Sequence, residues 1–347
     1  MKTKSLIYNL LLITLSLFFC FLIAEIILRI IDPKQPKGTT YGYKLRYNSL
    51  GFRDRDYLIP KSVNKYRIVV LGDSFTWGLG VDENDTIPKL LESDLQEFSS
   101  NIEVINCGIE GTNTVQQLNI FKQRAIKYDP DLVLLIYYLN DIDFIPKLAN
   151  RYYDSSMYSN YLLTFNSGNA YGNSIRRFIS KVQIHSYFVS YLVPRIGALL
   201  RKFGVLDIAG FRYATAYNRM FDGFIDGNPG WEESKRALRE IIIACNKNKN
   251  RFILAIYPPL VDLNNYPGKK AHLAIANYCK SLGITSIDLL QSLENKNPVK
   301  LRVNYKDPHP NAVANKLVTM QILTVIKEAI PGNILKRSNK MRKSAND

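Results

Sequence analysis

Short apolar runs alternate with longer segments of helical periodicity over most of the chain. Runs rich in β-branched residues predict strands over 67–71, 102–106, 132–137, 252–257 and 284–289. Apolar residues spaced three and four apart predict helices over 85–98, 113–127, 231–246, 269–282 and 310–329. This alternation is typical of an α/β fold, a three-layer arrangement in which helices cover both faces of a parallel sheet. Ligand sites in such sheets lie at the carboxyl ends of the strands.

The N-terminus carries the longest apolar stretch. Residues 5–24 contain no charge, and apolar residues continue past Glu25 to residue 31. A helix over this stretch could cross a bilayer core of about 30 Å. A cleaved signal peptide and a buried core helix are the alternatives, but no small-x-small cleavage site follows the stretch and no polar face interrupts it. We therefore expect a single, uncleaved transmembrane helix.

Composition and charge narrow the class of protein. The 347 residues are 46% hydrophobic and 22% charged, which excludes a disordered or collagen-like chain. Four cysteines are too few for a disulfide scaffold, and the only histidines are His185, His272 and His309, which argues against a histidine-rich metal site. The net charge of +16 is spread along the chain, so we expect no nucleic-acid partner. We also expect no metal and no cofactor.

These patterns divide the chain into four parts. We expect the anchor over 1–31, a linker and N-terminal extension over 32–66, the α/β domain over 67–332 and a basic tail over 333–347. An insertion at about 151–230 interrupts the α/β domain and is rich in tyrosine. It is expected to be mainly helical, and either a lid over the strand ends or a packing subdomain. The tail is either a solvated chain end or a contact for an anionic surface.

Polar residues follow the first three predicted strands. Ser74 comes directly after the first strand at the start of a helical segment, where the helix dipole and backbone N–H groups favour an oxyanion. Gly111 follows the second strand and Asn140 the third, and each could donate a hydrogen bond to a bound group. Each residue also has a plainer interpretation, since Ser74 could simply cap a helix and the other two could lie in ordinary turns.

Asp307 and His309 stand two residues apart just before the last predicted helix, with prolines on both sides of the histidine. They add a general base and a carboxylate able to orient it. A nucleophile, an oriented base and oxyanion donors on one edge of a sheet are the groups that acyl transfer requires. The remaining histidines, His185 and His272, are expected to be packing or surface residues.

The order of these blocks resembles the SGNH (GDSL) hydrolase family, in its membrane-anchored bacterial type. Gly72-Asp73-Ser74 is similar to the first block, Gly111 to the second, Asn140-Asp141 to the third, and Asp307 with His309 to the last. The resemblance covers about 67–329 apart from the insertion. A segment upstream, Asn48-Ser49-Leu50-Gly51-Phe52-Arg53, is also similar to one in those members, and the sequence alone assigns it no role.

The resemblance implies a flavodoxin-like sheet and a two-step acyl-enzyme mechanism. Ser74 would be the nucleophile, His309 the general base and then acid, and Asp307 the residue that orients the imidazole. The backbone N–H groups of Ser74 and Gly111 and the side chain of Asn140 would form the oxyanion hole. Two positions depart from the family pattern. Lys306 stands three residues before the histidine, where the carboxylate often lies, and Tyr138 replaces a common glycine, which is expected to narrow the pocket or redirect the loop.

These observations lead to a membrane-anchored serine esterase or deacylase as the first hypothesis. It would remove O-acyl groups, most simply acetyl, from a carbohydrate or cell-envelope glycan, or act on a small ester. The alternatives are an O-acyltransferase that uses the same Ser-His site and a non-catalytic glycan-binding domain of the same fold. Lys2 and Lys4 favour a cytoplasmic N-terminus, so we expect a single-pass protein of the bacterial cell membrane with its catalytic domain outside the cytoplasm.

Overall fold

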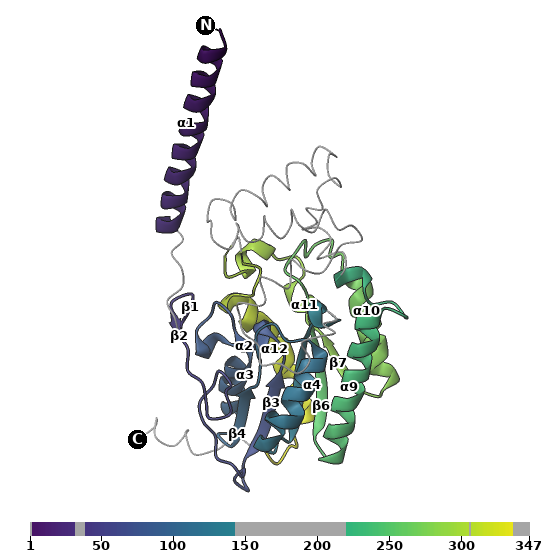
Figure 1. Ribbon diagram of the computed structural model, residues 1–347. Helices are drawn as coiled ribbons and strands as arrows, with labels where there is room; N and C mark the ends of the chain where they lie inside the picture. Colours follow the sequence, from purple (N-terminus) through teal and green to yellow (C-terminus); the bar gives the residue numbers. More distant parts are fainter. Residues whose placement is uncertain (1, 32–38, 143–219, 305–306, 336–347) are drawn as a thin grey trace, which may run out of the picture. The chain divides into compact units, whose positions relative to one another are not determined.

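A five-stranded parallel sheet forms the centre of the α/β domain in the computed structural model (Figure 1). The structure describes residues 2–31, 39–142, 220–304 and 307–335. The strands lie in the order β4-β3-β5-β6-β7. Their bounds are Tyr66–Leu71 for β3, Ile102–Asn106 for β4, Leu132–Tyr138 for β5, Arg251–Tyr257 for β6 and Thr285–Asp288 for β7.

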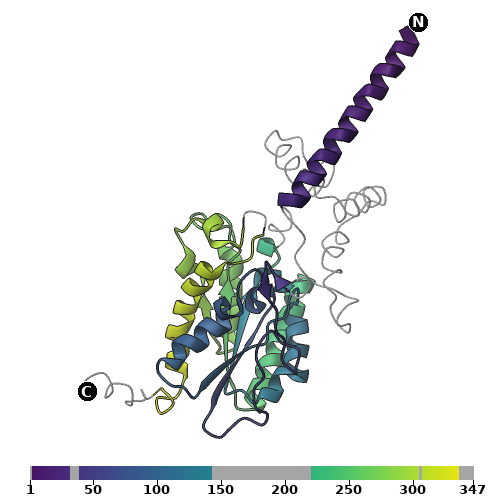
Figure 2. The same ribbon diagram turned by 90° about the vertical axis from the view of Figure 1, so that its left-hand side faces the viewer.

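Helices cover both faces of this sheet, as the two views show (Figures 1 and 2). Alternate strand residues point to opposite faces, so Ile68 and Val70 enter one core while Val69 and Leu71 enter the other. The first core is closed by α3 (Ile87–Gln96), α11 (Leu290–Leu293) and α12 (Ala312–Ala329). The second is closed by α4 (Thr114–Gln123), α9 (Pro229–Lys247) and α10 (Lys269–Ser281). The predicted α/β fold is confirmed.

The strand order places the ligand site. Counted along the sheet, the strands follow the flavodoxin-like order 2-1-3-4-5, in which β3 is the first strand and β5 the third. The chain leaves β3 in one direction to reach β4 and later crosses back to form β5, so the order reverses between these two strands. Open α/β sheets bind ligands at the carboxyl ends of the strands beside this reversal. Two of the candidate residues lie just beyond these strand ends, Ser74 after β3 and Asn140 after β5.

Two predicted helices are shorter than their periodicity suggests. The segment predicted over 85–98 begins as a short 3₁₀ helix, η1 (Glu83–Asp85), and Thr86 is extended before α3 starts. The segment predicted over 113–127 divides at Arg124 into α4 and the 3₁₀ helix η2 (Ala125–Tyr128). In the last helix Asn311 is the N-cap and accepts a hydrogen bond from the N–H of Ala314, so the helix starts at Ala312.

The apolar N-terminal stretch forms α1 (Lys2–Ile31). Many of its side chains are exposed, among them Leu11, Leu17 and Ile30. Charged residues stand near both ends, including Lys4 and the buried Glu25. Of the helices in the described ranges, none has both the length and the apolar character that crossing a membrane requires. The predicted transmembrane helix is therefore not supported.

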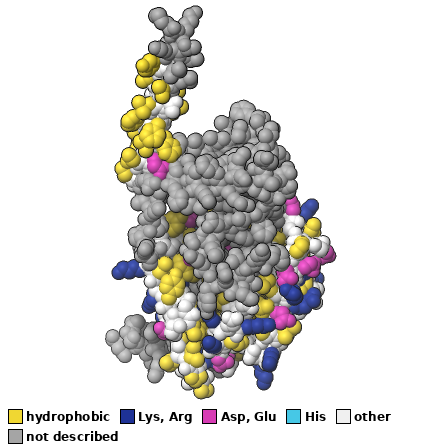
Figure 3. Space-filling view, in the orientation of Figure 1, with side chains coloured by type: hydrophobic (Ala, Val, Ile, Leu, Met, Phe, Trp, Pro, Cys, Tyr) yellow, Lys and Arg dark blue, Asp and Glu magenta, His cyan; other side chains and the backbone are white. Residues whose placement is uncertain are grey.

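Two other predicted parts fall largely outside the described ranges. Most of the insertion at about 151–230 and most of the basic tail over 333–347 belong to the residues that the structure does not describe. Over the described surface of the α/β domain that Figure 3 shows, basic and acidic side chains are interspersed. The face shown there carries no large patch of one sign among its described residues.

The N-terminal extension packs into the α/β domain. It starts with a small hairpin of β1 (Thr39–Thr40) and β2 (Tyr43–Lys44). A tight turn follows, in which the Asn48 side chain accepts hydrogen bonds from the N–H groups of Leu50 and Phe52. The next residues, Arg53 and Asp54, are fully buried. The extension is thus built into the domain rather than serving as a free linker.

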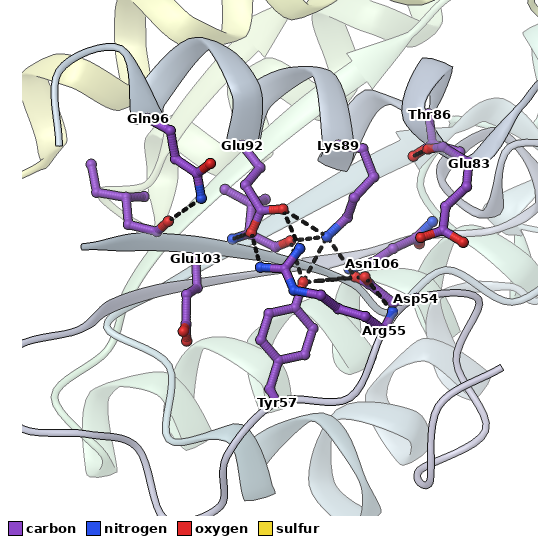
Figure 4. Close-up of polar contacts among 12 residues, drawn as sticks. Asp54, Arg55, Tyr57, Glu83, Thr86, Lys89, Glu92, Gln96, Glu103 and Asn106 are labelled. Carbon is purple, nitrogen blue, oxygen red and sulfur yellow. Dashed lines mark hydrogen bonds and ion pairs between the residues drawn. The ribbon is translucent and has the colours of Figure 1, made fainter. Parts of the chain in front are cut away.

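A buried ionic cluster fastens this extension to α3 (Figure 4). Lys89 Nζ lies 2.9 Å from Asp54 Oδ2 and 3.1 Å from Glu92 Oε2. Arg55 donates to both carboxylate oxygens of Glu92, at 2.7 and 3.0 Å, and Tyr57 donates to Asp54. Removing one partner from such a cluster leaves a buried charge without compensation, so the segment is held firmly in place.

Candidate active site

Ser74 begins a four-residue helix, α2 (Ser74–Trp77), directly after β3. Asp73 caps this helix, because its side chain accepts the N–H of Phe75 at 2.9 Å. The helix ends at Gly78, whose left-handed φ of 89° is one that glycine adopts without strain. The serine is largely buried, with 8% of its surface exposed.

His309 reaches this serine from the loop before α12. Its Nε2 lies 2.8 Å from Ser74 Oγ, although the two residues are 235 positions apart in the chain. The loop is held by two backbone hydrogen bonds, in which Val303 N–H donates to the His309 carbonyl and Asn311 N–H to the Leu301 carbonyl. The imidazole also packs against the Phe75 ring, with 5.2 Å between centroids. The base therefore stands where it can accept the hydroxyl proton.

Asp307 lies on the other side of the imidazole. Its Oδ1 is 2.6 Å from His309 Nδ1 and also accepts the His309 backbone N–H at 2.9 Å. Although burial favours the neutral acid, the hydrogen bonds from His309 and from the Tyr41 hydroxyl hold the pKa of this carboxyl below its ordinary value. The spacing of two residues therefore brings the carboxylate to the correct ring nitrogen. Position 306 is not among the described residues.

The predicted oxyanion donors lie on the two loops beside Ser74. Gly111 follows β4 and has a φ of 66°, a left-handed value that residues with a side chain rarely adopt. The loop that carries it is fixed to the nucleophile strand, because the Ile109 N–H and the Thr112 hydroxyl both donate to the Gly72 carbonyl. Asn140 lies in the 3₁₀ helix η3 (Leu139–Ile142), directly after β5. Their donation to a bound oxyanion stays a prediction.

Two further carboxyl groups are close enough to His309 for its charge to affect their pKa values. Burial raises the pKa of Asp73 to about 6, although the Phe75 N–H, a protonated His309 and the Asn140 side chain oppose the shift. Burial also raises the pKa of Glu110, again against the attraction of His309. Negative charge on these groups would favour the imidazolium that forms when Ser74 is deprotonated. Glu110 could not be predicted from the sequence, because an acidic residue in a turn is ordinary.

Tyr138, the position where the family often has glycine, packs in the core. It is the last residue of β5, is 5% exposed and stacks on Phe75 with 4.0 Å between ring centroids. Its ring therefore belongs to the core. His272 is a packing residue, 2% exposed, with Nδ1 2.7 Å from Asp288 and Nε2 3.0 Å from the Tyr266 hydroxyl. His185 lies outside the described residues, within which no three metal-binding side chains form a group able to hold an ion.

Tyr41 is a residue of the site that the sequence alone does not predict. It lies in the turn of the β1–β2 hairpin, and its hydroxyl donates to Asp307 Oδ2. The contact joins positions 266 residues apart, so no local sequence pattern predicts it. We expect Tyr41→Phe to lower kcat for p-nitrophenyl acetate about two- to tenfold, because a hydrogen bond to a charged group is lost where water can partly replace it. Steady-state kinetics with purified protein measures this effect.

The matched control for that substitution is Tyr43→Phe. Tyr43 lies on the same hairpin and is similarly exposed, at 41% against 37%, and its hydroxyl does not bond to the described triad residues. It should retain full activity. Equal kcat values for the two variants would show that the Tyr41 contact contributes nothing.

Comparisons with known proteins agree with this geometry. The model of the GDSL-like lipase/acylhydrolase family matches residues 70–317. A search of curated proteins finds no match. Among solved structures, the chain is similar to an acetylxylan esterase from Geobacillus stearothermophilus, Axe2, with 12% identity and a TM-score of 0.44 over 75% of this chain and 94% of that one.

Two further structures show a similar degree of likeness. The esterase EstA from a Pseudoalteromonas species has 14% identity and a TM-score of 0.42, with 76% of this chain and 98% of that one covered. A member of the lipolytic G-D-S-L family from Veillonella parvula has 14% identity and a TM-score of 0.41, covering 76% and 98%. The family match spans well over half of the chain, and it includes Ser74, His309 and Asp307. The chain belongs to the GDSL-like lipase/acylhydrolase family and is a serine ester hydrolase.

Proposed function

We propose that this hydrolase removes short O-acyl groups, such as acetyl, from a carbohydrate or cell-envelope glycan through an acyl-enzyme. The observation that carries the proposal is the continuous hydrogen-bonded series from Ser74 Oγ through both nitrogens of His309 to Asp307. These are the parts of a nucleophile activated by an oriented base.

The reaction proceeds in two halves. Ser74 Oγ attacks the ester carbonyl carbon while its proton passes to His309 Nε2, and the carbonyl oxygen becomes an oxyanion that the Ser74 and Gly111 N–H groups and the Asn140 amide stabilise. The bond to the sugar oxygen then breaks, and His309 returns the proton to that oxygen. In the second half a water molecule gives a proton to His309 and its oxygen attacks the acyl carbon. The carboxylic acid leaves and Ser74 regains its proton.

Two features of the site support a short acyl group and a sugar. The Phe75 ring packs beside His309, and the buried rings of Tyr138 and Tyr257 pack on Phe75, so the base stands against a fixed aromatic core that favours a short acyl group. Exposed tyrosines lie nearby on the extension. Tyr41 donates a hydrogen bond to Asp307, and Tyr47 is 52% exposed. The pKa of Tyr47 is raised, mainly by burial and further by the charge of Glu110, which places Tyr47 near that residue. Amphipathic aromatic rings of this kind can stack on a sugar face and still hydrogen-bond.

The test compares esters of increasing chain length and then polymeric substrates. We expect the full chain to hydrolyse p-nitrophenyl acetate with a kcat/KM at least about tenfold above that for p-nitrophenyl octanoate, because the rings packed on Phe75 hold it rigidly beside His309 and so disfavour a long chain there. Release of acetate from an O-acetylated polysaccharide, measured by chromatography, should then depend on Ser74.

The same experiment separates the alternatives. Acetate transfer to an added sugar that exceeds hydrolysis would identify an O-acyltransferase. Binding of the polysaccharide without turnover of any ester would identify a glycan-binding domain. A preference for the octanoate ester would contradict the proposed short acyl group. The predicted place of action, a bacterial membrane with the domain outside the cytoplasm, stays a prediction.

A further inference from the structure

The segment upstream of the nucleophile contains a fully buried arginine. Arg53, the last residue of the Asn48-to-Arg53 segment, has 0% exposure. Its guanidinium donates to the main-chain carbonyls of Trp77 at 3.2 Å, of Gly78, and of Val81 at 2.7 Å. It also lies over the Trp77 ring, 4.8 Å from the centroid. One side chain thus binds the whole C-terminal end of the nucleophile helix.

This end of the helix is coupled directly to Ser74. The helix has only four residues, and the N–H groups of Gly78 and Leu79 both donate to the Ser74 carbonyl, at 3.0 and 3.1 Å. Gly78 therefore connects the two groups, because its carbonyl accepts from Arg53 while its N–H donates to Ser74. A shift of the guanidinium would move the Gly78 peptide and, through it, the backbone of the nucleophile.

The neighbouring Asp54 holds the oxyanion side of the site. Its Oδ2 accepts the N–H of Asn106 at 2.8 Å, at the end of β4. The Asn106 side chain accepts the Gly108 N–H at 3.0 Å and donates to the Trp77 carbonyl at 3.4 Å. Trp77 is therefore shared by Arg53 and by the loop that leads to Gly111. Consecutive residues of the extension fix the nucleophile helix and this loop relative to each other.

We propose that Arg53 is a positioning residue of the active site, whose guanidinium holds the C-terminal end of the nucleophile helix and so sets the place of Ser74 Oγ relative to His309 and the oxyanion loop. A planar, forked cation has donors far enough apart to reach separate carbonyls while its plane lies on an indole ring. Lysine keeps the charge but offers a single ammonium, which cannot reach the carbonyls at both 77–78 and 81. This role rests on Ser74 being the nucleophile.

The test is Arg53→Lys in the full chain, with kcat and KM for p-nitrophenyl acetate and the rate at which a fluorophosphonate labels Ser74. A misplacement of reacting groups by about 1 Å lowers rates up to a hundredfold. We expect kcat and the labelling rate to fall together by about tenfold or more, while KM changes by less than about threefold. Rates are normalised to the folded fraction, measured by circular dichroism well below the melting temperature.

Arg67→Lys is the matched control. Arg67 is 1% exposed and donates to the carbonyls of Tyr128 at 2.8 Å and Leu58 at 2.9 Å, but it stands near the amino end of β3, away from Ser74. This variant should lose thermal stability and keep its kcat. If Arg53→Lys yields too little folded protein, Arg53→Gln, which leaves one amide donor and no buried charge, provides the same comparison.

The outcomes are distinct. A folded Arg53 variant with kcat and labelling rate within twofold of the wild type would overturn the proposal. So would an equal loss of kcat in the Arg67 control, which would mean that any buried arginine has this effect. A wild type no more active than Ser74→Ala would instead refute the serine mechanism itself, and with it the role of Arg53.

Discussion

Alanine in place of Ser74 is expected to abolish ester hydrolysis, with kcat for p-nitrophenyl acetate reduced by about 10³- to 10⁶-fold. His309→Ala should cause a loss of similar size, because the hydroxyl, 2.8 Å from the imidazole, is a weak nucleophile unless that imidazole removes its proton. The double variant should be no worse than either single one, since residues that act as a unit are not additive. Initial rates and fluorophosphonate labelling of each variant measure these effects.

The chain offers a matched control for each substitution. Ser234 is also buried and its hydroxyl is bonded, 2.9 Å from that of Thr114 and 2.8 Å from that of Tyr137. His272 forms a pair with Asp288 at 2.7 Å, much like that of His309 with Asp307. Alanine at Ser234 or His272 should lower stability and leave the activity of the folded protein within about twofold. A fully active Ser74→Ala enzyme would contradict the proposed nucleophile.

Asp307→Asn is expected to lower kcat by about 10²- to 10⁴-fold, a smaller loss than that of Ser74→Ala. Asp307 Oδ1 accepts from both Nδ1 and the backbone N–H of His309. An asparagine amide that turns its NH₂ group toward Nδ1 forces the proton onto Nε2, and the ring can then no longer accept the Ser74 proton. The residual activity comes from the oxyanion donors and from substrate binding. Measuring kcat from pH 5 to 9 gives the size of the loss.

The pH dependence of the wild type follows from the sign of the Asp307 shift. The pKa of the folded carboxyl lies below its ordinary 3.8, because the hydrogen bonds from His309 and Tyr41 outweigh burial. The ionised form therefore contributes its full stabilisation above the ordinary pKa of 3.8, and this contribution is lost as the pH falls from there through the lowered pKa. The matched control for Asp307→Asn is Asp288→Asn, which alters the other His–Asp pair and should leave kcat unchanged. An Asp307→Asn enzyme within fivefold of the wild type would show that orientation comes from elsewhere.

The strands and the chemical groups at their ends could be predicted from the sequence. Runs of apolar, β-branched residues predict buried parallel strands. Three of these strands are each followed by a candidate residue, namely Ser74, Gly111 and Asn140. The contact of His309 with Ser74 was an inference from the order of the family's blocks, and the structure brings the two together. The local pattern of apolar residues predicts whether a segment forms a helix or a strand. The shared carboxyl edge of a parallel sheet predicts which of the following loops lie close together.

Contacts made by the extension could not be predicted in the same way. Arg53 and Tyr41 act through hydrogen bonds to a helix end and to a carboxylate far along the chain, and such contacts leave no periodicity. The packing of Tyr138 could not be predicted for a related reason, since the place of a ring at a strand end depends on its neighbour, here Phe75. The predicted transmembrane helix rested on apolar length alone, and the described helices do not support it.

The distance in sequence between nucleophile and base has a consequence for the newly made protein. During synthesis, the first strand, the nucleophile helix and most of the sheet emerge long before residue 309. Until α12 has been translated and has packed with α3 into the first core, the serine has no partner to take its proton. A nascent chain, or one truncated before α12, is therefore inactive, and esterase activity reports that α12 has been translated and has packed against α3.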